Sequence, residues 1–305
     1  MVEIVGFGQC CMDYLALGDE YPAEDSKVEF RELLIQGGGP VATALVCLAR
    51  LGRKTSIIGL VGDDSFGRDI RAELEEEGVE TVHLITRENA VSQFSFILVN
   101  PHTSTRTINW TRATGAPVRA DRIPRELIRG AKILHLDGLD AEASLAAIHT
   151  AKKAGVAVVL DIGTLRSHSL ELIKNADQVI VSATFKKDFA PGEEPEEAAR
   201  RLRDLGPRAA VVTLGGDGSV GIEDRGLVRQ PAFPVRAVDT TGAGDAYHGG
   251  YIHALLEGAD LAGRMRFASA VAALSCTALG GRTALPTKDR VAGFLAATPA
   301  EQPGS

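Results

Sequence analysis

Apolar runs alternate with amphipathic stretches along most of the chain, and this pattern predicts its strands and helices. Residues 2–8 (VEIVGFG) form a short apolar run that is typical of a buried strand. From residue 123 onward, apolar runs and helical patterns follow one another regularly. This order indicates a mostly parallel sheet covered by helices on both faces. The expected strand segments of this part are 132–138, 156–163, 178–183 and 209–224, and the expected helices are 141–154, 165–175 and 195–205.

Two N-terminal stretches follow a different pattern. Residues 15–35 are polar and irregular, which suits a few short strands. Residues 91–99 and 105–111 alternate like the two strands of a hairpin. We therefore expect a small β-sheet lid made of 15–35 and 90–112. The remaining assignments are an α/β core made of 1–14, 36–89 and 113–298, and a flexible tail at 299–305.

The stretch 238–257 (VDTTGAGDAYHGGYIHALLE) combines glycines, a carboxylate and a helical pattern. Gly242 and Gly244 allow backbone N–H groups to converge at the first helical turn, where the helix dipole adds positive potential. Such a turn binds anions such as phosphate. Asp245 lies in the same turn and could accept a proton from an attacking hydroxyl. A purely structural strand-to-helix turn explains this stretch equally well when it is taken alone.

Other positions are candidates for ligand contact. Asp13 comes shortly after the first strand, where open α/β sheets bind ligands, although a simple loop aspartate is as good an explanation. The glycines of 37–40 (GGGP) precede a predicted helix and suggest backbone close to a ligand, or a tight turn. Residues 213–218 (TLGGDG) suit a nucleotide's phosphates or ribose, or a plain β-turn. Residues 280–282 (GGR) offer carbonyl groups to a ligand or cation.

Several enzyme classes are excluded by missing motifs. The chain has no G-x-x-x-x-G-K-[ST], which excludes a P-loop kinase, and no H-R-D or D-F-G, which excludes a protein kinase. Residues 6–8 (GFG) lack the third glycine of the dinucleotide fingerprint, so a nicotinamide-dependent oxidoreductase is disfavoured.

Composition and charge narrow the picture further. The 305 residues are 45% hydrophobic and 24% charged, as in an ordinary globular protein. A net charge of −7 without a basic cluster argues against a nucleic-acid partner. No apolar run has membrane-spanning length, so no membrane partner is expected. The four cysteines form no zinc-type pairing, and together with the absence of a signal sequence they predict a cytoplasmic protein with reduced thiols.

Taken together, these motifs resemble the ribokinase-like (PfkB) family of sugar and nucleoside kinases. The complete D-T-x-G-A-G-D signature at 239–245 and the GG-containing segment at 37–52 carry the resemblance, which spans nearly all of 2–296. It implies a three-layer α/β/α core with a mostly parallel sheet, plus the small β-sheet lid. Within the family the chain is most similar to sulfofructose kinases. The similar segments are VGDD at 61–64, TINW at 107–110 and RFASAVAALSCTALGGR at 266–282, together with Lys27.

The resemblance also implies roles for individual residues. Asp245 would be the general base, and the N–H groups of Gly242, Ala243 and Gly244 would stabilise the transferring phosphoryl group. The sugar pocket would be lined by Asp13, Lys27, Gly38, Gly39 and Asn109. ATP, with Mg²⁺, would contact Thr213, Gly215 and Gly218, and a helix after Gly281 would flank the adenine. K⁺ or a similar monovalent cation would be held by Asp239, Thr241, Ser275, Ala278 and Gly280.

The chain also departs from the family pattern. Ala42 and Gly163 replace two asparagines that many members carry, and residues 182–185 (SATF) replace the Asn-x-x-Glu that organises magnesium and phosphate. The resemblance to sulfofructose kinases implies a sulfonate-binding arginine at position 138, and this chain has Gly138 there instead. Arg112 or Arg282 could substitute for that arginine.

The resulting hypothesis is an ATP-dependent kinase acting on a hydroxyl of a small sugar or sugar derivative. Lys27 and Asn109 favour a substrate with an anionic or polar far end, such as a sulfosugar or phosphosugar, with a neutral ketose as the next choice. A nucleoside kinase and a catalytically silent sugar-binding regulator on the same fold remain alternatives. A homodimer is expected through the two lid stretches, because a flat sheet with free edges is a natural pairing surface.

Overall fold

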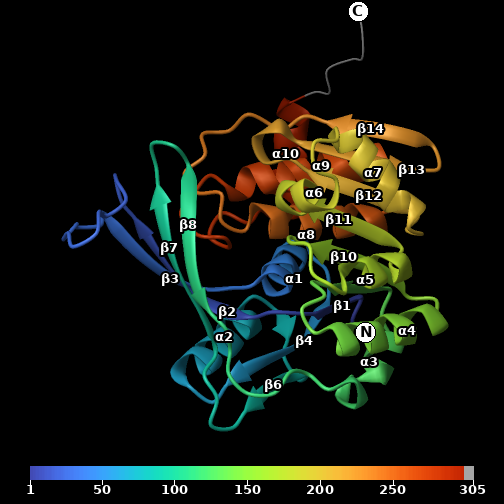
Figure 1. The fold of residues 1–305 in the computed structure, drawn as a ribbon, viewed down its shortest axis with the longest axis horizontal. Coiled ribbons are helices and arrows are strands. Elements are labelled where there is room, and N and C mark those ends of the chain that lie inside the picture. The colour runs from blue at the N-terminus through green and yellow to red at the C-terminus, as the bar shows by residue number, and fades with distance from the viewer. Residues whose placement is uncertain (299–305) are drawn as a thin grey trace, which may run out of the picture.

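The computed structural model describes residues 1–298, and their strands form two separate sheets (Figure 1). The expected flexible tail at 299–305 lies outside the described residues. The large sheet has the strand order β14-β13-β12-β11-β10-β9-β1-β4-β5, and β6 pairs with β4. Its strands are β1 (Ile4–Phe7), β4 (Thr55–Gly62), β5 (Val79–Glu80), β6 (Leu84–Arg87), β9 (Ile133–Leu136), β10 (Ala157–Ile162), β11 (Gln178–Ser182), β12 (Ala209–Thr213), β13 (Ser219–Glu223) and β14 (Gly226–Gln230).

From β12 across the sheet to β5, in the order given above, adjacent strands are parallel. Only the pairs β12-β13 and β13-β14 are antiparallel. The central strands are short and almost wholly buried, because helices cover both faces. One apolar cluster joins the sheet to α1 (Pro40–Arg50), α2 (Ser65–Glu76), α8 (Ala243–Leu256), α9 (Leu261–Ser275) and α10 (Lys288–Ala297). The other joins it to α3 (Arg125–Arg129), α4 (Ala141–Lys153), α5 (Ser169–Asn175), α6 (Ala183–Phe189) and α7 (Pro195–Asp204). The expected three-layer α/β/α architecture is confirmed.

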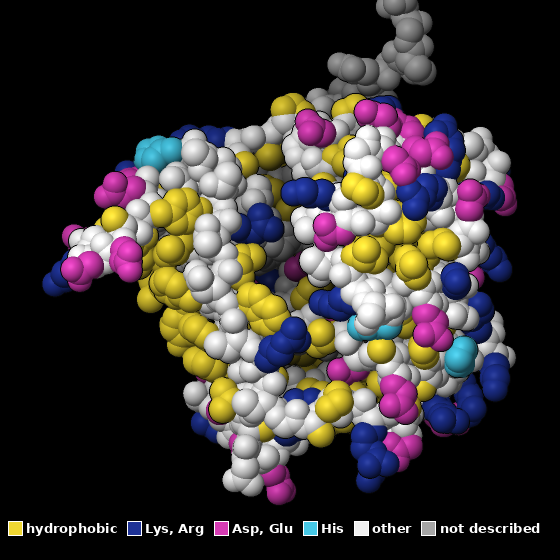
Figure 2. All heavy atoms as spheres, viewed as in Figure 1, with side chains coloured by type: hydrophobic (Ala, Val, Ile, Leu, Met, Phe, Trp, Pro, Cys, Tyr) yellow, Lys and Arg dark blue, Asp and Glu magenta, His cyan; other side chains and the backbone are white. Residues whose placement is uncertain are grey.

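The small sheet has the order β3-β2-β7-β8 and stands beside the core (Figure 1). Its strands are β2 (Cys11–Leu17), β3 (Glu32–Gly38), β7 (Gln93–Asn100) and β8 (Thr105–Thr111). Strands β2 and β7 are parallel, and the other two pairs are antiparallel. On one face, Leu15, Ile97 and Val99 pack with Leu279 of the core, and we call this the inner face. Figure 2 shows apolar side chains gathered over this sheet and a hollow between it and the core.

The structure differs from the predicted elements in a few places. Strand β2 begins at Cys11, so Asp13 lies inside the small sheet and not in a loop after the first strand. No helix follows Gly281 directly, because residues 281–284 form a turn and α10 begins only at Lys288. The short β5, β6 and α6 were not expected from the pattern, because each is too short for a period to show. Within residues 1–298, no helix is long and apolar enough to cross a membrane.

Candidate active site

The glycine turn before α8 has the geometry that the sequence predicts. Gly242 precedes the helix with φ 72° and ψ 1°, a left-handed conformation that a side chain would strain. A Cβ at Gly242 would also lie 2.8 Å from the Cα of Gly281. No side chain caps the helix, and the N–H of Ala243 donates to the Thr240 carbonyl over 3.3 Å. An uncapped helix start of this kind is suited to bind an anion.

Asp245 lies in the first turn of α8, and its partly buried carboxyl group is surrounded by other charged side chains. Burial raises the pKa of Asp245 to about 8, and the carboxylates of Asp161 and Asp13 act in the same direction. The guanidinium groups of Arg106 and Arg282 oppose this rise. A carboxyl group with a pKa near neutrality is suited to accept and release a proton at physiological pH.

Asp13 and the 37–40 segment meet at the end of the small sheet. Asp13 is 9% exposed, and its Oδ1 accepts a hydrogen bond from the Cys11 thiol over 3.2 Å. Gly38 contacts the Asp13 carboxylate so closely that a Cβ there would overlap its Oδ2. Gly39 has φ 99°, and a Cβ at this position would collide with the Gln9 carbonyl oxygen. These glycines are therefore needed for the backbone to pass beside Asp13.

Two residues that were predicted to contact the substrate, Lys27 and Asn109, are not part of the group formed by Asp13 and residues 37–40. Lys27 is exposed in the segment between β2 and β3. Asn109 pairs across the small sheet with Phe96, and Phe96 pairs with Tyr14, so Asn109 lies on the outer face. Asp13 is on the other face, because adjacent residues of a strand point to opposite sides.

Asp137 is a buried carboxylate that the sequence pattern did not single out. It follows β9, whose neighbour in the sheet is β1, and its Oδ2 accepts the Gln9 N–H over 2.8 Å. The Leu139 N–H binds its other oxygen over 3.1 Å. Burial raises the pKa of Asp137 to about 6. A carboxylate after a central parallel strand is a sequence signal that could have identified it, because ligands bind at the carboxyl ends of such strands.

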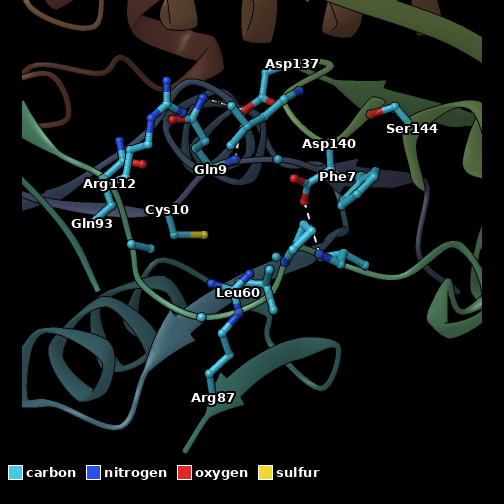
Figure 3. Close-up of a pocket in the computed structure, with 17 residues that line it drawn as sticks. Phe7, Gln9, Cys10, Leu60, Arg87, Gln93, Arg112, Asp137, Asp140 and Ser144 are labelled. Carbon is cyan, nitrogen blue, oxygen red and sulfur yellow. Dashed lines mark hydrogen bonds between the residues drawn. The ribbon is translucent and has the colours of Figure 1, made fainter. Parts of the chain in front are cut away.

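A smaller cavity of about 220 Å³ opens beside Asp137, between the core and β7 of the small sheet. Gln9, Asp137 and Asp140 project into it from the core, while Arg87 and Arg112 approach it from the other side (Figure 3). The polar side chains that line it are Gln9, Arg87, Gln93, Arg112, Asp137, Asp140 and Ser144.

A larger cavity of about 650 Å³ contains the predicted nucleotide contacts. Thr213, Gly215 and Gly218 line it together with Ala243 and Gly244 of the anion-binding turn. One wall is apolar and comes from 232–237, from Ala272 and Ala273 of α9, and from Cys276 directly after this helix. The helix that follows Gly281 is α10, and it supplies no residue to the lining of this cavity, whereas α9 does.

Arg106 of β8 was also missed by the sequence reasoning. Its Nη1 donates to the Thr240 hydroxyl over 2.9 Å, and its side chain lines the larger cavity. At the hairpin turn beside it, Ser104 donates to the Ala237 carbonyl over 3.0 Å. The small sheet is thereby bonded to the loop that leads into the anion-binding turn. Strand alternation places Arg106 on the same face as Ile108 and Trp110. This placement alone is only a weak sequence signal that Arg106 lines a cavity.

The predicted cation residues form a tightly bonded loop. Asp239 is 1% exposed, and its Oδ1 accepts both the N–H and the hydroxyl of Thr241 over 2.8 Å. Its Oδ2 accepts the Gly280 N–H over 2.9 Å. Ser275 is the last residue of α9, and Ala278 follows in the turn that leads to Gly280.

The two arginines that were considered for substrate binding, Arg112 and Arg282, lie in different surroundings. Arg282 is 2% exposed, and its Nη2 donates to the Gly38 carbonyl over 3.0 Å, so this hydrogen bond helps to hold the glycine segment in place. Arg112 lies over the Trp110 ring, 5.1 Å from its centre, at the edge of the smaller cavity. Gly138 adopts φ 65°, and a Cβ there would lie 2.6 Å from Leu172, so only glycine fits this turn without rearrangement.

A mostly parallel α/β sheet, a small second sheet, and a glycine turn before a helix that carries a partly buried carboxylate are features of an ATP-dependent phosphotransferase. The chain belongs to the pfkB family of carbohydrate kinases, whose family profile matches residues 1–288. It is 31% identical to a ribokinase from Haemophilus influenzae, over 85% of this chain and 87% of that protein. A nucleoside kinase from Methanothermobacter thermautotrophicus is 28% identical and covers 96% of both chains. The crystal structure of ribokinase from Thermotoga maritima superposes with a TM-score of 0.84 at 24% identity, over 97% of this chain and all of that one.

Proposed function

We propose that this chain transfers the γ-phosphoryl group of ATP to a hydroxyl of a small sugar, with Asp245 as the general base. The observation that carries the proposal is the position of Asp245. It directly follows Gly244, which lines the larger cavity, and its carboxyl group is electrostatically coupled to Asp13 beside Gly38. A base between the two binding regions can take the acceptor proton while the glycine turn binds the phosphoryl group.

The proposed reaction proceeds in one step. The acceptor O–H gives its proton to Asp245, the resulting oxygen attacks the γ-phosphorus, and the bond to the β-phosphate oxygen breaks to release ADP. The N–H groups of Gly242, Ala243 and Gly244 stabilise the charge on the transferring group. Apolar groups around 232–237 and α9 pack against the adenine.

Mg²⁺ is expected to arrive bound to the ATP phosphates. Within residues 1–298, no three His, Cys, Asp or Glu side chains come together so that they could hold a metal ion. Ser182, which replaces the asparagine of Asn-x-x-Glu, instead caps α6 by accepting the Phe185 N–H over 3.1 Å. When bound, the ion would neutralise phosphate charge, and its remaining ligands would be water.

The acceptor is proposed to be a polyhydroxylated sugar with an anionic end. Asp13 and Asp137 supply carboxylates that accept hydrogen bonds from sugar hydroxyls. Arg87 and Arg112 line the smaller cavity, and neither is within ion-pair distance of a carboxylate in the described part of the chain. Such cations favour a carboxylate, phosphate or sulfonate on the substrate.

A coupled assay of ADP release with Mg·ATP across an acceptor panel tests the proposal. The panel contains sulfofructose, fructose, fructose 6-phosphate, ribose, deoxy-ketogluconate and adenosine. We expect an anionic sugar to have the highest kcat/KM, and Arg112→Met to lower that value selectively. Highest activity with a neutral sugar would refute the anionic end, and highest activity with adenosine would favour a nucleoside kinase.

A catalytically silent sugar-binding regulator is the second candidate, favoured by the loss of Asn-x-x-Glu. The two candidates differ in their response to Asp245→Asn. A kinase loses turnover in this variant, whereas a regulator has no turnover to lose and still binds sugar in a calorimetric titration.

K⁺ or a similar monovalent cation is proposed to bind at the 239–241 loop. The donors available there are carbonyl, carboxylate and hydroxyl oxygens of Asp239, Thr241, Ser275, Ala278 and Gly280, which are hard ligands suited to such an ion. Equal rates in potassium and in tetramethylammonium chloride would contradict this proposal.

A further inference from the structure

His248 occupies a position directly behind the anion-binding turn. It lies one helical turn after Asp245 in α8, is 4% exposed, and its Nδ1 is 2.8 Å from the Gly244 carbonyl oxygen. A carbonyl oxygen can only accept a hydrogen bond, so Nδ1 must carry a hydrogen. This contact therefore determines which nitrogen of His248 is protonated first.

The other ring nitrogen faces a carboxylate. Nε2 of His248 is 3.6 Å from Oδ1 of Asp161, which lies near the end of β10, and within the described residues Nε2 has no hydrogen-bond partner. If His248 were neutral, the Nε2 lone pair would face the negative charge of Asp161 in a buried environment. Such a contact is repulsive, and a second proton on the ring converts it into an attraction.

The titratable and charged groups around this pair are His135, Arg166 and the Asp161 carboxyl group itself, and burial raises the pKa of Asp161. His135 of β9 lies with its ring centre 5.5 Å from that of His248, and its Nδ1 donates to the Val159 carbonyl over 3.1 Å. Burial lowers the pKa of His135 to about 3, with the nearby His248 acting in the same direction, so His135 stays neutral. Arg166 is the other cation whose charge acts on Asp161.

We infer that His248 carries a proton on Nε2 that neutralises Asp161, and that this ion pair is a positioning element for the base Asp245. The effect of the pair on Asp245 as a base rests on the proposed function. The protonation of His248 and Asp161 does not depend on it. The charges that face Asp245 come from Asp161, Arg106, Asp13 and Arg282. Among these, Asp161 has a histidine partner, and removal of that partner leaves Arg166 as the remaining cation that acts on Asp161.

Substitution of the two partners should affect the pH profile differently. His248→Gln removes one of the two cations that act on Asp161, so we expect the acidic limb of kcat/KM to move upward by about one pH unit. Asp161→Asn removes the carboxylate and, with it, the second proton of His248, so the pair stays neutral and the limb should move little. His149→Gln, an exposed histidine on α4, is the matched control and should leave the limb in place. Equal loss of rate in both variants without displacement of the limb would overturn the inference.

Nitrogen-15 NMR of the histidine rings tests the pair without any substrate. We expect both nitrogens of His248 to be protonated near pH 7, and Nε2 to lose its proton in Asp161→Asn. A neutral His248 in the unsubstituted protein at this pH would refute the ion pair. Absence of turnover on every acceptor would refute the proposed function, while the NMR result would still decide the state of His248.

Discussion

At the residue scale, Asp245 has the clearest chemical role, and its substitution gives the first prediction. Asp245→Asn keeps the size of the side chain but cannot accept the acceptor proton. We expect kcat to fall by about 10² to 10⁴-fold with little change in KM for ATP. The coupled assay measures both constants, and a variant that retains more than a tenth of the rate would contradict the assignment of this residue as the base.

The raised pKa of Asp245 predicts how activity and stability depend on pH. The base must be ionised, so kcat/KM of the free enzyme should fall as the pH drops below about 8. Between about pH 4 and 8 the folded protein retains the proton that the unfolded chain releases, so Asp245 makes stability decrease as the pH rises. Asp245→Asn should therefore gain stability relative to the unsubstituted protein over this range in urea unfolding. A constant difference between the two proteins across the range would argue against the raised pKa.

Gly242 tests the geometry of the anion-binding turn. An alanine there would adopt φ 72° beside the backbone of Gly281, so we expect a loss of about 1–3 kcal/mol of unfolding free energy and a lower kcat. Gly293→Ala is the matched control, because this helical glycine in α10 has open space around it and should gain about 0.5–1 kcal/mol. Similar effects of the two substitutions would show that the turn is not strained against a side chain.

At the scale of elements, the hairpin β7-β8 connects the small sheet to the nucleotide region through Arg106. Arg106→Met removes the bond to Thr240 and a cation that lines the larger cavity. We expect KM for ATP to rise about tenfold, equivalent to one charge-assisted hydrogen bond. Arg31→Met, which removes an exposed ion pair with Asp19 in the segment between β2 and β3, is the control and should leave KM unchanged. An unchanged KM in Arg106→Met would mean that this arginine only fixes the hairpin.

At the scale of the whole molecule, the outer face of the small sheet predicts an association of two chains. Leu33 and Ile35 lie on this face and are 56% and 49% exposed, with Phe96 and Leu98 beside them. We propose a homodimer formed through this face, because burying such an apolar patch is favourable. Light scattering should give about twice the chain mass of 32.2 kDa, and Leu33→Glu should reduce it to one chain. Val82→Glu, at a residue that is 78% exposed outside this sheet, is the control, and a monomeric unsubstituted protein would refute the dimer.

Most of the architecture could be predicted from the sequence because it depends on local periodicity. Buried parallel strands such as β10 and β11 are continuous apolar runs, and helices such as α1 and α7 have a clear start and a helical pattern. The glycine turn and Asp245 were also evident, since they lie within one short segment whose motif is visible in the sequence. Short elements such as β5 and α6 were missed, because two to seven residues are too few to define a period.

The tertiary structure alone decided which distant residues share the site. Asp137 and Gln9 are far apart in the chain and meet because β1 and β9 are neighbours in the sheet. The register of β2, β7 and β8 separates Asn109 from Asp13, since a strand's side chains alternate between its two faces. The sequence by itself thus determined the fold, the glycine turn and the position of Asp245 in it, which depend on patterns that are local in the chain. The acceptor pocket and the charges around Asp245 depend on strand order and register, which local pattern does not encode.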